Sequence, residues 1–248
     1  MERVFTATLL LTVLATLSIG VCAQSASRDA VLKAIAAKRA ELQQLEDQFL
    51  SPAEEDRAAY KELLSQPDTG LIRLLPREVY ESEVYKKNQK TLTIRGGGAY
   101  YSFTLRTYEY GNATDIGLEQ GYLQVGFAGA DYGMLTKFSD VPLEVLSVEH
   151  PSIHFLAAYS AVSEEPQARL EQRRFGTGTT IDGQVYGERL PVEIGATYVL
   201  RSINYSDSDV LVGFRIIRKD TDGSIIIAWK LLKKYPKPEL VRPVKAAN

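Results

Sequence analysis

The sequence predicts a mainly β protein, an antiparallel β-sandwich or partly closed barrel that carries an N-terminal helical hairpin and one internal helix. Apolar residues recur at helical spacing in the first part of the chain and alternate with period two from Gly70 onward. Turns instead of helices separate most of the strand-like segments, which favours antiparallel pairing. We expect a signal peptide over residues 1–23, a helical hairpin appendage over 24–69, an antiparallel β-domain over 70–235 and an extended, partly disordered tail over 236–248.

The first 23 residues have the layout of a secretory signal peptide. A charge-poor start is followed by an almost unbroken apolar run from Val4 to Ile19, and Ala23 supplies a small residue at the exit. The run is shorter than the roughly 20 residues that cross a bilayer. We therefore expect a secreted or periplasmic protein that begins at Gln24 and has no transmembrane anchor after cleavage.

Cleavage after Ala23 would remove Cys22, which is the only cysteine. The mature chain would then have neither a disulfide nor a cysteine nucleophile. Lipidation of Cys22 is the alternative, although Val21 stands where a lipoprotein signal has a small residue. The chain has a formal net charge of −2. It therefore lacks the excess of basic residues that is typical of proteins that bind nucleic acid or an anionic membrane.

The expected appendage consists of two helices. Ser27 can cap the first helix, whose apolar stripe is interrupted by Lys38 and comprises Val31, Ile35, Leu42, Leu45 and Phe49. The sequence Ser51-Pro52-Ala53-Glu54 has the pattern of a capping box for the second helix. The stripe is too short and too interrupted for a stable coiled coil, so we favour a monomer in which it packs on the β-domain.

Alternation and turn residues place the strands of the β-domain. We expect strands at residues 71–75, 91–95, 99–110, 116–129 with a bulge near Gln120, 134–138, 143–148, 153–159, 185–190, 197–203, 210–219 and 224–233. The internal helix is expected from a cap at Ser163 to about Arg174. The strand at 210–219 is apolar on both faces, which is typical of a central, covered strand. A final hairpin centred on Thr221 would bury Trp229 opposite Gly213.

Few residues suggest a metal or cofactor site. The chain's two histidines, His150 and His154, would be about 13 Å apart on a strand, too far to share one ion. The segment Asp220-Thr221-Asp222-Gly223 begins like a calcium loop, but Leu231 stands where the closing glutamate belongs. A nucleophile elbow, a phosphate loop and a correctly placed dinucleotide motif are missing from the sequence. We expect no metal and no cofactor.

A tyrosine-rich face is the best positive feature of the sequence, which has fourteen tyrosines and one tryptophan. If the segments 99–110 and 116–129 form a hairpin, one surface would carry Tyr100, Arg106, Tyr108, Tyr122 and Gln124. Tyrosine rings among amide and guanidinium groups suit a carbohydrate, a peptide or a protein partner. The alternative is that these tyrosines simply pack on a half-buried sheet.

The sequence favours a non-enzymatic binding or structural module outside the cytoplasm, with an unidentified protein or carbohydrate as its partner. The alternative is a carbohydrate-active hydrolase with two carboxylates, which would have to lie about 5 Å or 6.5–9.5 Å apart. Its candidate residues are Glu109, Glu119, Asp131, Asp140, Glu149 and Glu188. A concave site that gathers carboxylates with raised pKa values would distinguish the enzyme from the binding module.

We predict that the exported protein begins at Gln24, because the exit of the apolar run has the small residue that signal cleavage needs. Intact-mass measurement of protein recovered after export checks this. A mass that includes residues 1–23, or a lipid adduct on Cys22, would contradict it.

Overall fold

The computed structural model describes residues 27–81, 96–111, 113–138 and 141–241. The chain divides into two compact units, Met1–Phe49 and Leu50–Asn248. The expected signal peptide, Cys22, the strand at 91–95 and the end of the tail lie outside the described residues. Among the described residues, no helix combines the length and the apolar composition that crossing a membrane requires.

The first unit is helical in its described part. One continuous helix covers residues 27–50, which confirms the helix expected there. The helix is supported by side-chain pairs one turn apart, Lys38 with Glu41 at 2.6 Å and Gln43 with Asp47 at 2.9 Å. Its large apolar side chains are exposed, namely Val31, Leu32, Ile35, Leu42, Leu45 and Phe49. The surface that covers this stripe stays a prediction.

The second unit begins at Leu50, so the short helices α2 (Glu54–Ala59) and α3 (Lys61–Leu64) belong with the sheets. The helix α2 starts two residues later than the expected capping box. Its N-cap is Ala53, whose backbone N–H donates to the Asp56 carboxylate at 3.3 Å. The cap that we assigned to Ser51 and Glu54 is therefore wrong, and the acidic side chain three residues after Ala53 takes that role.

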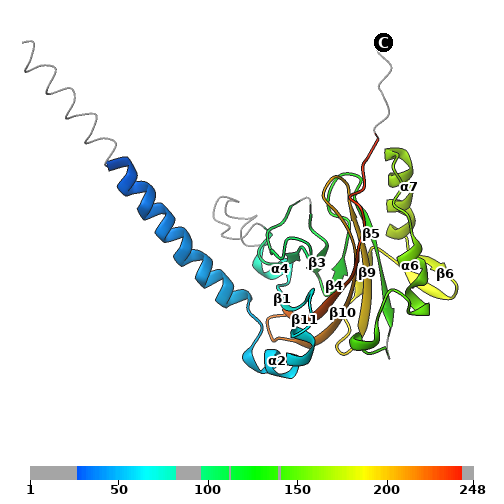
Figure 1. Cartoon of the computed structure of the whole chain (residues 1–248), viewed down its shortest axis with the longest axis horizontal. Coiled ribbons are helices and arrows are strands. Elements are labelled where there is room, and N and C mark those ends of the chain that lie inside the picture. The colour runs from blue at the N-terminus through cyan, green and yellow to red at the C-terminus, as the bar shows by residue number, and fades with distance from the viewer. Residues whose placement is uncertain (1–26, 82–95, 112, 139–140, 242–248) are drawn as a thin grey trace, which may run out of the picture. The chain divides into compact units, whose positions relative to one another are not determined.

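The second unit is mainly antiparallel β, as expected, and contains three sheets, none of which is closed in the described chain (Figure 1). The five-stranded sheet has the order β1 (Thr69–Leu74), β11 (Ile225–Lys234), β10 (Ser208–Lys219), β9 (Thr197–Asn204) and β5 (Tyr132–Phe138). The four-stranded sheet has the order β2 (Tyr100–Tyr101), β3 (Ile116–Glu119), β4 (Tyr122–Gln124) and β8 (Arg189–Pro191). The last sheet is the hairpin of β6 (Thr179–Ile181) and β7 (Gln184–Tyr186).

The five-stranded sheet is covered on both faces. An inter-sheet core lies between it and the four-stranded sheet, and includes Ile72, Phe103, Leu118, Leu123, Tyr198, Phe214, Ile227 and Trp229. A helix-side core lies on the other face under the helices α6 (His154–Ala158) and α7 (Glu165–Gly176) (Figure 1). It includes Met134, Ile153, Leu156, Ala168, Phe175, Val199 and Leu211. Alternate residues of β10 enter opposite cores, so the expected central strand is confirmed.

Two expected strands, 143–148 and 153–159, are wrong because both segments are helical. The structure has short 3-10 helices η2 (Leu143–Val145) and η3 (Pro151–Ile153), and the α-helix α6 (His154–Ala158). Prolines begin both segments, and the buried residues recur at a spacing of three, Leu143 with Leu146 and Ile153 with Leu156. That spacing belongs to one face of a helix, and its short length hid the signal.

The remaining helices are α4 (Arg77–Tyr80) and α7 (Glu165–Gly176). The expected internal helix is confirmed as α7, with Glu164 instead of Ser163 at its N-cap. The described part of the tail is extended up to Val241. It is fixed to the start of α7 by backbone hydrogen bonds, from Val241 N–H to Ser163 O at 2.7 Å and from Glu165 N–H to Val241 O at 3.1 Å.

The expected long strand at 99–110 is also wrong. The strand β2 ends at Tyr101, and the chain then reverses in a turn that Arg106 completes with φ 54°. Backbone hydrogen bonds close the turn, from Arg106 N–H to Ser102 O at 2.8 Å and from Ser102 N–H to Thr107 O at 2.9 Å. Leu105, which lies in this turn, is consequently 63% exposed.

The phase change that we expected to come from a bulge near Gln120 comes from a tight hairpin turn. Gln120 and Gly121 have φ of 51° and 75°, the conformation of a two-residue turn, and they join β3 to β4. The expected strand at 185–190 likewise divides into β7 and β8, which lie in different sheets.

Trp229 is buried, as expected, in the inter-sheet core with Ile225 and Ile227. The expectation that Gly213 lies opposite Trp229 is wrong. Register shifts in the β10–β11 pair place Phe214 opposite the indole on one side, and Gly70 lies opposite on the other. A Cβ atom on Gly70 would lie 2.7 Å from the indole Nε1. Gly70, and not Gly213, therefore provides the space that the indole occupies.

We predict that Gly70→Ala lowers the free energy of unfolding by about 1–3 kcal/mol, because the added methyl group overpacks the indole. Trp229→Ala should cost about 3–5 kcal/mol through the cavity it leaves. Urea unfolding followed by circular dichroism measures both. The matched control is Gly111→Ala, where nothing lies within 4 Å of the added atom, and we expect a change within about 0.5 kcal/mol. Equal effects at Gly70 and Gly111 would contradict the assignment.

Candidate functional site

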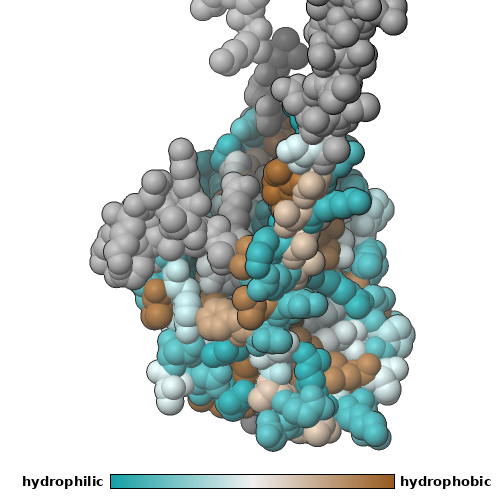
Figure 2. Space-filling model, turned by 90° about the vertical axis from the view of Figure 1, so that its left-hand side faces the viewer, coloured by the Kyte–Doolittle hydropathy of each residue, from teal (hydrophilic) through white to brown (hydrophobic). Residues whose placement is uncertain are grey.

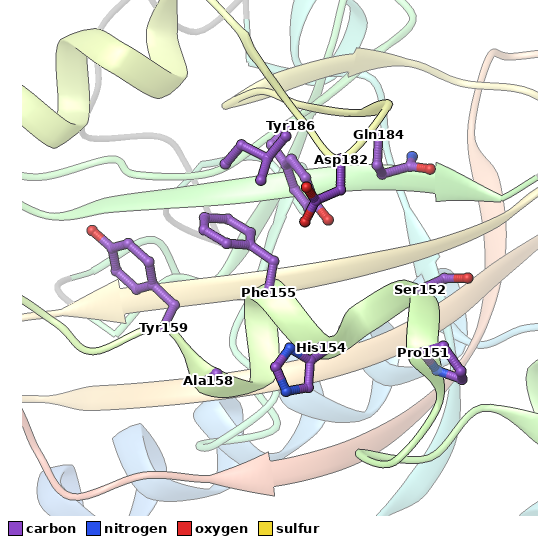
Figure 3. Close-up of a pocket in the computed structure, with 10 residues that line it drawn as sticks. Pro151, Ser152, His154, Phe155, Ala158, Tyr159, Asp182, Gln184 and Tyr186 are labelled. Atoms are coloured by element: carbon purple, nitrogen blue, oxygen red, sulfur yellow. The ribbon is translucent and has the colours of Figure 1, made fainter.

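A pocket lies between the helical segment η3–α6 and the β6–β7 hairpin (Figure 3). Its volume is about 480 Å³, within the range of small-molecule sites. The lining residues are Pro151, Ser152, His154, Phe155, Ala158, Tyr159, Ile181, Asp182, Gln184 and Tyr186.

One wall of the pocket is a helical face. Pro151 starts the helical segment, and the His150 side chain accepts the Ser152 backbone N–H at 3.3 Å. Helical spacing then presents His154, Phe155 and Ala158 to the pocket, while Ile153 and Leu156 are buried in the helix-side core.

This wall is held at its carboxyl end by two donors from the sheet side. Arg201 Nη1 donates to Leu156 O and the Tyr235 hydroxyl donates to Ala157 O, both at 2.8 Å. These bonds satisfy carbonyls that the short helix leaves free. Arg201 is itself buried and paired with Asp209, at 2.5 and 2.9 Å. The position of α6 is therefore tied to strands β9 and β10.

The opposite wall is the β6–β7 hairpin. Asp182 and Gly183 have φ of 50° and 79°, so this Asp-Gly pair forms the two-residue turn of the hairpin. Alternation places Gln184 and Tyr186 on the pocket side and leaves Val185, 51% exposed, on the other. The Thr136 hydroxyl donates to Val185 O at 2.9 Å, which fixes the hairpin to β5.

Aromatic rings form the floor between the two walls. The ring centroids of Phe155 and Tyr186 lie 4.8 Å apart, and those of Phe155 and Tyr159 lie 5.8 Å apart. Figure 3 shows Phe155 pointing from the helix toward Tyr186 and Asp182 of the hairpin. Burial, with the Asp182 charge in second place, raises the pKa of Tyr186. The tyrosines are therefore neutral hydrogen-bonding groups on an apolar surface.

The polar side chains of the pocket differ in whether they already hydrogen-bond with other residues. The Gln184 amide donates to Lys137 O at 3.2 Å and to the Thr136 hydroxyl at 2.5 Å, so its orientation is fixed. The His154 and Asp182 side chains are exposed at the rim, and no residue of the described chain hydrogen-bonds with either. A ligand would find the His154 and Asp182 side chains ready to bond and the Gln184 amide held in place.

The pocket contains one carboxylate, Asp182, where a two-carboxylate hydrolase needs a pair. The carboxylates expected from the sequence line other parts of the molecule, and Asp140 lies outside the described residues. Burial raises the pKa of Glu188 and Asp209, and raises that of Asp115 and Asp131 to about 6. None of these four carboxylates lines the pocket. The described chain therefore lacks the concave site with several raised carboxylate pKa values that would favour the hydrolase.

The carboxylates whose pKa values are raised to about 6, Asp115 and Asp131, form hydrogen bonds that hold the fold together. Asp115 is completely buried and accepts the Phe103 backbone N–H at 2.8 Å and the Asn204 amide at 3.0 Å. Asp131 accepts the Tyr205 backbone N–H at 2.9 Å. These carboxylates hold loops against β9, and desolvation by burial is the main cause of their raised pKa values.

The structure separates the tyrosine face that the sequence predicted. Tyr100 pairs with Gly117, and Gly117 with Gln124, so Tyr100, Tyr122 and Gln124 share the outer face of the four-stranded sheet. Tyr100 is 7% exposed and packs on Tyr110, whereas Tyr122 is 40% exposed. The Arg189 guanidinium covers the Tyr122 ring at 4.2 Å from its centroid.

Arg106 and Tyr108 lie elsewhere, because β2 ends before them. Tyr108 packs on the inter-sheet core, and its hydroxyl accepts the Arg73 backbone N–H at 3.1 Å. The Arg106 guanidinium lies over the Trp229 ring and bonds Asp68 at 3.2 Å. Only the outer-face group of Tyr100, Tyr122 and Gln124 can form one surface, and its binding role stays a prediction.

The histidines also differ from the expectation. His150 caps η3 as a turn residue, but His154 begins α6 and does not enter a strand. In the described chain, no three His, Cys, Asp or Glu side chains form a group that could hold a metal ion. The pocket itself was missed from the sequence. Its available signals were the Asp182-Gly183 turn and the helical spacing that follows Pro151.

In comparisons with known proteins, no family model, no curated protein and no solved structure matches this chain.

We predict a stability change with pH that Asp115 carries. Because its pKa is raised in the folded state, to about 6 from 3.8, the folded protein binds this proton more tightly than the unfolded chain. The contribution of Asp115 to the free energy of unfolding is therefore greatest below about pH 4 and falls by about 2–3 kcal/mol as pH rises through 6.

The measurement is urea unfolding of the wild type and of Asp115→Asn from pH 4 to pH 7.5. The wild type should lose stability relative to the variant across that range. Asp29→Asn, at an exposed helix position, controls for the change of charge. A difference between wild type and Asp115→Asn that does not vary with pH would contradict the prediction.

Proposed function

We propose that this protein is an exported, non-enzymatic binding protein whose β-domain, a two-sheet sandwich with helices on its outer side, binds a small polar ligand in the pocket between α6 and the β6–β7 hairpin. The observation that carries the proposal is the combination of an aromatic floor with polar side chains at the rim of one concave site. Such combinations fix both the burial and the orientation of a ligand.

A neutral pyranose sugar is the ligand class that these groups suit best. The C–H face of a sugar ring can pack on the half-buried Phe155, which the buried Tyr186 supports with its ring centroid 4.8 Å away, while the sugar hydroxyls bond His154 and Asp182. The single carboxylate can accept hydrogen bonds from hydroxyls, but it lacks the second carboxylate of a glycosidase. That composition supports binding without hydrolysis.

Export is the second part of the proposal, and the sequence of residues 1–23 supports it. Loss of Cys22 with the signal peptide would leave a mature chain without thiols, which is compatible with an oxidising compartment. Stability would then come from the two cores of the β-domain alone.

We predict that saturation-transfer NMR with a panel of neutral pyranoses detects binding that depends on this pocket. His154→Ala and Asp182→Asn should each weaken binding about tenfold, the loss of about 1.4 kcal/mol expected for a hydrogen bond to the ligand. Val185→Ala is the matched control, because its side chain lies on the other side of the same hairpin, and it should bind as the wild type does.

Two results would overturn the proposal. One is release of reducing sugar from oligosaccharides at a rate that the pocket variants lower, which would indicate a hydrolase. The other is binding that Val185→Ala weakens as much as His154→Ala does, which would place the ligand elsewhere.

A further inference from the structure

The helix of residues 27–50 has an apolar stripe of regular spacing. Counting from Val31, the steps to Ile35, Lys38, Leu42, Leu45 and Phe49 are four, three, four, three and four, the spacing of a coiled-coil seam. Each apolar member is at least 40% exposed. Figure 2 shows apolar side chains between polar ones along this helix.

The charges of the helix are divided between its two halves. The first half carries Arg28, Lys33, Lys38 and Arg39 with one acidic residue, Asp29, whereas the second half carries only acidic charges, at Glu41, Glu46 and Asp47. Basic residues near the start and acidic residues near the end oppose the helix dipole, so this distribution weakens the isolated helix. Its favourable partner is a helix of the same sequence running in the opposite direction.

We propose, in place of the monomer expected from the sequence, that two copies of the chain pair through this helix as an antiparallel coiled coil, because the stripe is exposed and the charges of the two halves are complementary. The proposal goes beyond the binding function and does not depend on it. Antiparallel pairing places the basic half of each helix beside the acidic half of the other. It also opposes the two helix dipoles, which parallel pairing would align.

The seam fits one antiparallel register throughout. With residue 40 of both copies at the centre, Ile35 lies opposite Leu45, Val31 opposite Phe49, and Leu42 opposite Lys38. Every seam position then meets a seam position of the other copy, as antiparallel coiled coils require. Arg39 lies beside Glu46 of the other copy, on the flank of the same seam.

Lys38, which interrupts the stripe, has a place in this register. Its ammonium lies 2.6 Å from the Glu41 carboxylate of its own helix, and the register brings both such pairs to the centre. Four alternating charges can then meet at the centre, with the lysine stems packed beside Leu42. In a parallel pair, Lys38 would face Lys38 and Glu41 would flank Glu46, which sets like charges together.

Analytical ultracentrifugation of the exported full chain over a range of concentrations tests the pairing. We expect a dimer that dissociates on dilution. Leu42→Asp should raise its dissociation constant at least tenfold, while Ala40→Asp, on the outer face of the same helix, should leave it unchanged. Unchanged emission of Trp229 would show that the β-domain of Leu42→Asp remains folded.

Charge reversal tests the direction. Arg39→Glu and Glu46→Arg should each weaken the dimer, and the double variant should restore it, because the two residues meet only between antiparallel copies. They are seven positions apart on one helix, about 10.5 Å, too far for a direct pair.

Three results would overturn the proposal. A monomer at all concentrations would show that the stripe packs on the β-domain or, if phospholipid vesicles co-sediment with it, on a membrane. A dimer that Leu42→Asp leaves intact would place the interface elsewhere. A dimer that Leu42→Asp disrupts but that the double charge variant does not restore would have another direction or register.

Discussion

Burial of strand β10 on both of its faces is the constraint from which the rest of this structure follows. Val212 and Phe214 enter the inter-sheet core, whereas Leu211 enters the helix-side core. A strand that is apolar on both sides requires a layer above and a layer below it, and the four-stranded sheet and the helices supply them. The pocket lies where α6 faces the β6–β7 hairpin, which Thr136 ties to β5.

Polar groups inside these layers determine position more than stability. The buried Arg201–Asp209 pair joins β9 to β10 and, through Leu156 O, holds the helix that forms one pocket wall. Buried ion pairs contribute little net stability but are costly to break, so the position of that wall is well defined. Asp115 acts in the same way on the other side of the sheet, where it fixes the turn after β2.

The sequence predicted those parts of the fold that local pattern determines. The strands β9, β10 and β11 have long apolar alternation, and α7 has twelve residues with a proline in its first turn, so all four were found. The strand prediction for the segment after Tyr101 was wrong because the chain turns there. The Asp115 carboxylate, twelve residues further along the chain, accepts the Phe103 backbone N–H and stabilises the turn. Gly213 was the wrong partner for Trp229 because the hairpin is centred on Asp222 and not on Thr221. A register shift between Ile216 and Arg218, which has no local signature, then brings Phe214 opposite the indole. The candidate pocket joins two segments that are unrelated in sequence, so local reasoning could not assemble it.

Tyr108, which does not lie on the expected binding face, protects an edge of the five-stranded sheet. Strand β1 lies at an edge of the five-stranded sheet, where free backbone donors would invite a strand from another molecule. The Tyr108 hydroxyl takes the Arg73 N–H, and Gly98 O takes the Leu75 N–H. At the opposite edge, Leu135 exchanges two backbone hydrogen bonds with Gly187. Both edges are thereby blunted against strand addition, which protects a protein rich in β-structure from aggregating through its sheets.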